Sequence, residues 1–362
     1  MRITELRERT IAVGAPMRNA AIAFDEMTAS AVAMVSDRGI TGYAFDSIGR
    51  YGKGALLRER FFPRLAGRSF VDSAGLIDPP ACARAAMANE KPGGHGERPG
   101  AIGLIEAAAW DLRAKTQGVP LWRSIADYYG EQGSSTISVY ASCGHFRDDG
   151  ALIDEVRKAV DLGYRTVKIK ALGNDEDLRR IERVAGLASL AVDLNGAETG
   201  DEWFRSVAPF HLAWVEEPAP PLDYERLRRV AEISAAPLAT GENLFSYDDA
   251  HNLLRYGGLR AQRDFIQVDP LLAYGVAEYV RILELFGAWP RRQFLPHAGH
   301  LFAAHCVAAL GLGMAEAAPD ASLIYGGYWD RVRVDAGRVK IPDAPGVGFE
   351  TKANLFAVLE ST

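Results

Sequence analysis

Three carboxylates recur at nearly even intervals in the middle of the chain, each closing a short apolar run. They are Asp193, Glu216 and Glu242, and the steps between them are 23 and 26 residues (216 − 193 and 242 − 216). One strand and its return helix take about that length in a parallel α/β barrel of roughly 250 residues. Carboxylates gathered at one end of such a barrel repel one another, and a hard divalent cation with oxygen ligands relieves the repulsion. We therefore expect these three residues to bind Mg²⁺, one ion per chain, with Mn²⁺ as the alternative.

The preceding strand-like run carries two lysines. In Thr166–Lys170 the side chains of Lys168 and Lys170 fall on one face, because the side chains of a strand alternate with period two. Next to a cation and to each other, the two amines are expected to have depressed pKa values, which suits a base that works near neutral pH. The alternative is an exposed edge strand with solvated lysines, although a central barrel strand has no exposed edge.

Asp269 and His297 extend the same series, with steps of 27 and 28 residues (269 − 242 and 297 − 269). On adjacent strand ends, Asp269 would accept a hydrogen bond from one ring nitrogen of His297, which fixes the tautomer and raises the basicity of the other nitrogen. This dyad would face the lysines across the barrel mouth, and a satisfied structural histidine is the alternative. His300 and His305 lack the phasing, so we interpret them as helical residues that are structural or support the site.

A lysine and a histidine on opposite sides of a bound cation suit the removal of a proton α to a carboxylate. That proton is only weakly acidic, so the cation must stabilise the negative charge that develops as the proton leaves. One group removes the proton, and the opposite group protonates a departing hydroxyl. The residues thus predict a metal-dependent enzyme with a small anionic substrate.

Regular elements must hold these residues in place, and between about residue 135 and residue 316 apolar runs alternate with helical stretches. The expected strands are Ile137–Ala141, Thr166–Lys170, Leu190–Leu194, Ala213–Glu216, Leu238–Gly241, Phe265–Val268, Gln293–Leu295 and Leu312–Ala315. The expected helices include Ala151–Leu162, Asp175–Leu187, Tyr224–Ile233 and Val276–Phe286, with Asn174, Asp223 and Ser246 as N-caps. Strict alternation favours a parallel sheet, and eight evenly spaced strands favour its closure into a barrel over residues 131–324.

The two flanking regions have a different pattern. Residues 1–130 suggest a β-meander with strands at Ala29–Val35 and Thr41–Phe45. Three helices are expected to follow, at Leu56–Leu65, Pro80–Asn89 and Ala101–Thr116. This pattern predicts an α+β capping domain. Residues 325–362 have a turn at 335–337 between two alternating apolar runs, and we expect this C-terminal segment to pack back on the capping domain.

Composition narrows the function classes. The chain has 362 residues, and its net charge of −6 argues against nonspecific nucleic-acid binding, which relies on a basic face. The three cysteines form no Cys-x-x-Cys pair, so a zinc site or a disulfide framework is not expected and a reducing cytoplasm fits. Residues 1–20 lack the apolar centre of a signal peptide, and no apolar run approaches the roughly 18 residues of a membrane span.

This set of residues resembles the enolase superfamily, mandelate racemase subgroup, over nearly the whole chain. The resemblance implies an N-terminal α+β capping domain, a (β/α)7β modified TIM barrel and assembly into a homo-oligomer. It implies that Lys170, the second lysine of a Lys-x-Lys strand with Lys168, is one acid/base residue and that His297 with Asp269 is the other. It also implies that Mg²⁺ is bound by the three carboxylates above, with Glu216 rather than its neighbour as the ligand.

The same resemblance suggests residues that bind substrate. Glu316, at the end of the eighth strand, matches a position that hydrogen-bonds the substrate carboxylate, and the alternative is a solvated loop acid. Asn195 is a further candidate.

A narrower likeness, to the D-tartrate dehydratases of that subgroup, is found in the strings Met17–Ala20, Gly49–Gly52, Asn89–Arg98, Ala239–Ser246 and Leu253–Gly258. It implies that Asn19 binds a substrate hydroxyl or carboxylate and that Lys91 brings a cation to a second carboxylate, where a surface lysine is the alternative. The chain departs from these relatives at Asp46-Ser47-Ile48, where they have Asn-Ser-Asn, and at Cys143-Gly144-His145-Phe146-Arg147, where they have Gly-Gly-Tyr-Tyr-Tyr. We therefore expect the specificity surface to be altered while the reaction class is kept.

The expected function is that of a Mg²⁺-dependent hydro-lyase. Lys170 would remove the α-proton of a hydroxy-dicarboxylate or acid sugar, and His297 would protonate the departing β-hydroxyl. With D-tartrate, the favoured substrate, the enol product would become oxaloacetate. Alternatives on the same scaffold are a racemase or epimerase and a dehydratase of a different acid sugar. A barrel kept only as a binding or assembly module is the non-catalytic alternative.

Overall fold

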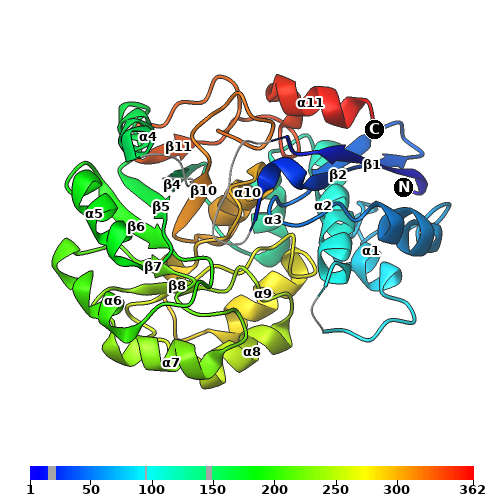
Figure 1. The fold of residues 1–362 in the computed structure, drawn as a ribbon. Helices are drawn as coiled ribbons and strands as arrows, with labels where there is room; N and C mark the ends of the chain where they lie inside the picture. The colour runs from blue at the N-terminus through cyan, green and yellow to red at the C-terminus, as the bar shows by residue number, and fades with distance from the viewer. Residues whose placement is uncertain (15–21, 94–95, 144–148) are drawn as a thin grey trace.

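The computed structural model describes residues 1–14, 22–93, 96–143 and 149–362. Its centre is a parallel sheet that curls into a barrel, with helices around the outside (Figure 1). Neighbouring strands follow the order β10-β4-β5-β6-β7-β8-β9, so each strand from β4 to β8 pairs with the next one along the chain. The strands are β4 (Thr136–Cys143), β5 (Thr166–Lys170), β6 (Ser189–Asp193), β7 (Val215–Glu216), β8 (Leu238–Thr240), β9 (Phe265–Ile266) and β10 (Met314–Ala317). The predicted α/β class with a barrel-like parallel sheet is confirmed.

Helices follow the strands as the alternation predicted. They are α4 (Asp149–Asp161), α5 (Asp175–Val184), α6 (Asp201–Ser206), α7 (Tyr224–Ile233), α8 (Tyr247–Tyr256), α9 (Val276–Leu285) and α10 (Leu301–Leu310). The three predicted N-caps are confirmed, because the side chains of Asn174, Asp223 and Ser246 each accept a hydrogen bond from a backbone N–H of the first turn. These caps fix where α5, α7 and α8 begin, and so fix the loops that carry side chains at the strand ends.

One predicted strand, Gln293–Leu295, is wrong. Arg291–Gln293 forms a single 3-10 turn, and Pro290 and Pro296 on either side have no N–H to give to a sheet ladder. The wall of the barrel still passes through this segment. Phe294 forms a parallel bridge with Ile266, and the N–H of Gly313 donates to the carbonyl oxygen of Phe294 at 2.9 Å. The segment therefore joins β9 to the chain entering β10 without being a regular strand.

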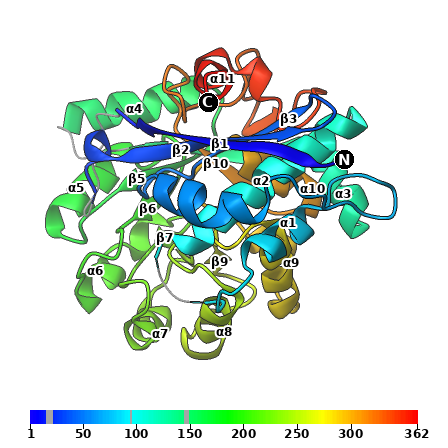
Figure 2. The ribbon, with the colours of Figure 1, turned by 90° about the vertical axis from the view of Figure 1, so that its right-hand side faces the viewer.

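Residues 1–130, which we call the capping region, contain a second sheet. It is antiparallel in the order β1-β2-β3, formed by β1 (Ile3–Ala12), β2 (Thr28–Ser36) and β3 (Thr41–Phe45) (Figure 2). Its helices are α1 (Pro79–Ala86), α2 (Arg98–Gln117) and α3 (Leu121–Tyr129), and the helix predicted at 56–65 is a π-helical turn (Leu56–Phe61) followed by a 3-10 turn (Phe62–Arg64). The charged edge strand β1 and the helix α3 were not predicted.

Helix α2 is buried from Pro99 to Ala114 and connects the capping region to the barrel. It contacts β2 and β3 on one side and α9 on another. Two glycines allow these close approaches, because a Cβ on Gly42 would lie 2.2 Å from the carbonyl oxygen of Ala108, and one on Gly103 would lie 1.9 Å from that of Leu271. The loop that contains Leu271 follows Asp269, so this packing also bears on the histidine side of the site.

The C-terminal segment touches both sheets. Strand β11 (Arg338–Lys340) pairs antiparallel with the first residues of β4, and α11 (Ala353–Glu360) contacts β2 and β3. The domain boundaries at residues 130 and 324 stay a prediction. Among the residues that the structure describes, no helix combines the length and apolar character needed to cross a lipid bilayer.

Candidate active site

The three phased carboxylates lie together at one end of the barrel. Asp193 and Glu216 end β6 and β7 and are partners in the parallel register, and Glu242 comes two residues after β8. Each offers a carboxylate oxygen, these oxygens all lie within 4.8 Å of one another, and all three residues are buried. Oxygen ligands at this spacing suit a hard divalent cation. The donor set thus fits a hard divalent cation such as Mg²⁺, and the assignment of the three residues as its ligands stays a prediction.

Both lysines point from β5 toward these carboxylates. Strand β5 lies between β4 and β6, and both lysines are buried, so the alternative of an exposed edge strand is wrong. Lys170 pairs in register with Asp193, and its Nζ donates to Asp193 Oδ2. Lys168 Nζ donates to Glu216 Oε1 and lies 3.4 Å from Asp193 Oδ2. The two amines therefore share the carboxylates of the metal site.

The charges of the described side chains raise both lysine pKa values, whereas the depression expected next to a bound cation stays a prediction. Burial favours the neutral amine, but Asp193 outweighs it and raises the pKa of Lys170, while Glu216 with Glu316 raises that of Lys168. In turn, burial would raise the pKa of Asp193, yet the two lysines lower it. The negative charge of the carboxylates outweighs both burial and the repulsion between the two ammonium groups. Residue spacing along the chain does not show this balance of charges.

The histidine side of the site stands next to the same carboxylates. His297 Nδ1 lies 3.4 Å from Asp269 Oδ2, and its Nε2 lies 3.6 Å from Glu242 Oε2. Burial favours the neutral ring, but Glu242 and Asp269 outweigh it and raise the pKa of His297 to about 9. The ring is therefore protonated at neutral pH and able to donate a proton.

Asp269 is held by donors from several segments. The N–H groups of Leu271 and Leu272 donate to Oδ1, and His300 Nε2 lies 3.2 Å from the same oxygen. His300 Nδ1 accepts from Ala303 N and so caps α10, which leaves Nε2 as the donor of the neutral ring. His300 thus supports the dyad. His305 does not reach it, because its Nδ1 accepts from Trp122 N and its Nε2 faces Val347 O.

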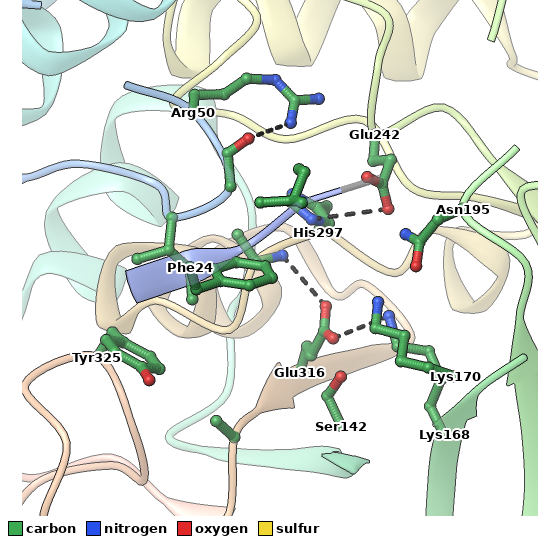
Figure 3. Close-up of a pocket in the computed structure, with 15 residues that line it drawn as sticks. Phe24, Arg50, Ser142, Lys168, Lys170, Asn195, Glu242, His297, Glu316 and Tyr325 are labelled. Carbon is green, nitrogen blue, oxygen red and sulfur yellow. Dashed lines mark hydrogen bonds and ion pairs between the residues drawn. The ribbon is translucent and has the colours of Figure 1, made fainter. Parts of the chain in front are cut away.

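The remaining predicted residues lie in different places. Glu316 is buried in the cleft, 2.9 Å from Lys168 Nζ, and accepts hydrogen bonds from Tyr140 and from Ala298 N, so the solvated-loop alternative is wrong. Asn195 also lines the cleft (Figure 3). Lys91 is exposed and is not among the cleft-lining residues. Asn19 and the string that contains it fall outside the described residues.

The cleft brings residues of the capping region over the barrel end. Figure 3 shows Lys168, Lys170, Asn195, Glu242 and His297 around one space, with Glu316 below and Arg50 above. Phe24, Ile48 and Tyr325 supply apolar wall. No functional role was predicted for Arg50, which lies in one of the resembling strings, or for Ser47, which contacts Asp269. Neither residue belongs to the series, spaced by one strand and one helix, from which the barrel residues of the site were predicted.

Arg50 is a cation without an acidic partner in the described part of the chain. Its guanidinium donates to the Gly49 carbonyl at 2.5 Å and to the Asn243 side chain, and it lies 5.6 Å from the centre of the Phe245 ring. No carboxylate of the described residues forms an ion pair with it, whereas both lysines of the cleft pair with carboxylates. Positive charge at this end of the cleft is therefore left for an anionic ligand.

The chain matches a known family and resembles several named proteins. The family model described as Enolase C-terminal domain-like matches residues 151–355. The chain is 29% identical over 210 residues to L-talarate/galactarate dehydratase of Salmonella typhimurium, covering 54% of this chain and 50% of that protein. It is 28% identical over 261 residues to o-succinylbenzoate synthase of Geobacillus stearothermophilus, covering 68% and 66%. The chain thus spans about half to two thirds of the length of these curated relatives.

Solved structures share the fold over almost the entire chain. A racemase from Streptomyces coelicolor A3(2) with bound magnesium has a TM-score of 0.80 at 23% identity, covering 98% of this chain and 99% of that one. L-talarate dehydratase from Polaromonas sp. JS666, complexed with Mg and L-glucarate, has a TM-score of 0.74 at 23% identity, covering 96% and 94%. At this identity the likeness establishes the architecture of barrel and capping region.

Proposed function

We propose that this chain, which belongs to the Enolase C-terminal domain-like family, is a Mg²⁺-dependent dehydratase of a hydroxy-dicarboxylate or acid sugar. The favoured substrate is D-tartrate, and its product would be oxaloacetate. One observation carries the proposal: two candidate proton-transfer groups stand next to one buried triad of carboxylates. Lys170 contacts Asp193, and His297 lies beside Glu242. Relatives named as dehydratases of talarate, galactarate and galactonate support the reaction class.

Asp193, Glu216 and Glu242 would hold the ion. Bound Mg²⁺ would supply positive charge that stabilises negative charge developing on the substrate carboxylate. Lys170 Nζ would accept the α-proton as the C–H bond breaks. In the structure, Asp193 raises the pKa of Lys170. Bound Mg²⁺ would offset the charge of Asp193 and, together with the ammonium of Lys168, would oppose the protonation of Lys170, so that its amine could accept the proton. Lys168 and Glu316, which are paired, would position the substrate carboxylate.

His297 would complete the reaction. Its protonated ring would give a proton to the β-hydroxyl as the C–O bond breaks, so that one water molecule leaves for each α-proton removed. The enol that remains becomes the keto acid by moving its hydroxyl proton to carbon. Asp269 holds the ring with Nδ1 toward it, which leaves Nε2 to face the substrate.

The charge of the cleft supports a substrate with two anionic groups. Arg50 has no acidic partner among the described residues, so we propose that it binds the substrate end far from the ion, in the role that the sequence suggested for Lys91. Arginine suits this task because its planar fork matches a carboxylate. Asn195 would bind a substrate hydroxyl, and Lys91 and Asn19 stay candidates from the resemblance alone.

A library of hydroxy-diacids and sugar acids, assayed for keto-acid formation with Mg²⁺ and again with a chelator, tests this function. We expect activity with at least one dicarboxylate that the chelator abolishes. Lys170→Ala should lower kcat by about 10²–10⁴-fold with Mg²⁺ binding retained in calorimetry. Full activity of Lys170→Ala would refute the role of this lysine.

A racemase or epimerase is the second candidate. The supporting observation is that Lys170 and His297 approach the carboxylates from different segments, β5 and the irregular segment that precedes α10, as two bases on opposite faces of a substrate would. A racemase from Streptomyces coelicolor A3(2) also shares the fold. Exchange of the α-proton with solvent deuterium, with inversion and no loss of water, would select this candidate over the dehydratase.

A further inference from the structure

Ser47 of the capping region forms a hydrogen bond with the aspartate of the dyad. Its Oγ donates to Asp269 Oδ2 at 2.7 Å, across 222 residues of sequence. Both side chains are fully buried, so no water competes for this bond. Oδ2 is also the oxygen that faces His297 Nδ1, whereas the N–H donors of Leu271 and His300 use Oδ1. Ser47 and His297 thus share one oxygen.

The loop that carries Ser47 is fixed by its neighbour. The carboxylate of Asp46 accepts from Lys53 Nζ at 2.8 and 2.9 Å, and the side chains of this pair are almost wholly buried. Asp46 N also donates to the carbonyl oxygen of Ser30 on β2. The backbone on the N-terminal side of Ser47 is therefore anchored to the antiparallel sheet, and its hydroxyl reaches the barrel from a fixed position.

We propose that Ser47 is a positioning residue that acts through Asp269 on His297. The hydroxyl holds the carboxylate plane so that Oδ2 points at the ring, and the ring then keeps Nε2 toward the substrate. Without it, Oδ2 loses its shortest donor and keeps only the 3.4 Å contact with His297. The capping region would thereby control the proton donor as well as the shape of the cleft.

Ser47 contacts the histidine side of the cleft through Asp269 and does not contact the lysine side, so its effect on the two sides can be measured separately. Lys170 is held by Asp193 in the sheet register and has no contact with Ser47. Loss of the Ser47 hydroxyl should therefore slow the protonation of the substrate's departing β-hydroxyl and leave removal of the α-proton by Lys170 intact. A residue that only stabilised the fold would affect both steps together. This reasoning rests on the proposed function, in which the two steps belong to different groups.

The experiment uses full-length, Mg²⁺-loaded Ser47→Ala, with Ser47→Thr as the variant that keeps a hydroxyl. Ser124→Ala is the matched control, because it removes another buried serine hydroxyl of the capping region, one bonded to Gln117 and not to the site. We expect Ser47→Ala to slow keto-acid formation about 10- to 100-fold and to change solvent deuterium exchange at the α-carbon less than about twofold. Ser47→Thr should recover much of the loss, and Ser124→Ala should change neither rate.

A measurement without substrate separates this inference from the proposed function. Two-bond ¹H–¹⁵N spectra of protein labelled at histidine report the hydrogen-bonding state of each ring nitrogen of His297. We expect wild-type protein and Ser124→Ala to show the same ring state and Ser47→Ala to show a shifted signal or a mixture. An unchanged His297 signal in Ser47→Ala, or equal losses of both rates, would overturn the inference. A wild-type enzyme with neither exchange nor dehydration would instead refute the proposed function, while the spectra would still decide the role of Ser47.

Discussion

The lysine side and the histidine side of the cleft are built in different ways. Lys170 and Asp193 stand at facing positions of two hydrogen-bonded strands, so the sheet register alone brings them together. Asp269 and His297 lie beyond a two-residue strand and on a segment that forms only a bridge. Their positions depend on contacts from other segments, among them Ser47 and His300. Half of the site is therefore set by local periodicity and half by tertiary packing.

This difference predicts that the two sides can be uncoupled by mutation. His297→Asn should lower keto-acid formation by about 10²–10⁴-fold, because the proton donor is lost, while α-proton exchange in deuterated solvent continues. Lys170→Ala should lower both rates by about 10²–10⁴-fold, since no elimination follows without removal of the α-proton. Mass spectrometry of recovered substrate measures the exchange. If His297→Asn also stopped exchange, the two sides would act as one unit and the comparison would fail.

A mutation at the capping end of the cleft should affect substrate choice more than chemistry. Arg50→Gln removes a cation that has no acidic partner among the described residues, so KM for a dicarboxylate should rise about 10- to 100-fold, the range for loss of a charge-assisted hydrogen bond. KM for the monocarboxylate of the same carbon chain should change less than about twofold. Initial rates with a matched pair such as galactarate and galactonate measure this.

Arg255→Gln is the control for that experiment, because Arg255 is an exposed residue of α8 outside the cleft. It should leave KM unchanged for both substrates. Equal KM changes for the two substrates in Arg50→Gln would show that Arg50 only holds the Asn243 loop, and binding of the second carboxylate would have to be assigned elsewhere.

The smallest effect on catalysis is expected at Glu106, which links α2 to α9. Its Oε1 accepts from Ala277 N at 3.2 Å, and burial raises its pKa to about 8. The folded protein therefore keeps Glu106 protonated at neutral pH, while the unfolded chain ionises it above its ordinary value of 4.5. Folding then takes up a proton, so this contribution to stability is complete below pH 4.5 and is lost as the pH rises to about 8.

In Glu106→Gln the side chain at this position does not titrate in either the folded or the unfolded state. The substitution should therefore remove this pH dependence of the stability. Between pH 5 and pH 8 we expect the free energy of unfolding of the wild type to fall by about 3 kcal/mol more than that of the variant. Urea denaturation at several pH values measures both proteins, and kcat at neutral pH should be nearly equal. Parallel stability curves would show that Glu106 is ionised in the folded state.

Regular elements were predicted well because their signals are local. The bounds of β5 and α7 agree with the prediction, since alternation in Thr166–Lys170 and the cap at Asp223 depend on neighbouring residues only. Prediction failed where packing decides: Gln293–Leu295 has a strand-like run but two flanking prolines, and β1 is a charged edge strand that its partner β2 stabilises. Apolar periodicity carries no information about either outcome.

Residue spacing was enough to predict the barrel and the phased carboxylates, because a repeat of one strand and one helix places every strand end at the same rim. It also determined the strand face shared by Lys168 and Lys170. Two features depend on tertiary packing: Ser47 reaches Asp269, and Arg50 has no acidic partner in the part of the chain that the structure describes. The same packing sets the charge balance of the cleft, in which the buried carboxylates raise the lysine pKa values. Such contacts join residues far apart in the chain, and charge balance in a buried cleft depends on distances that spacing along the chain does not contain.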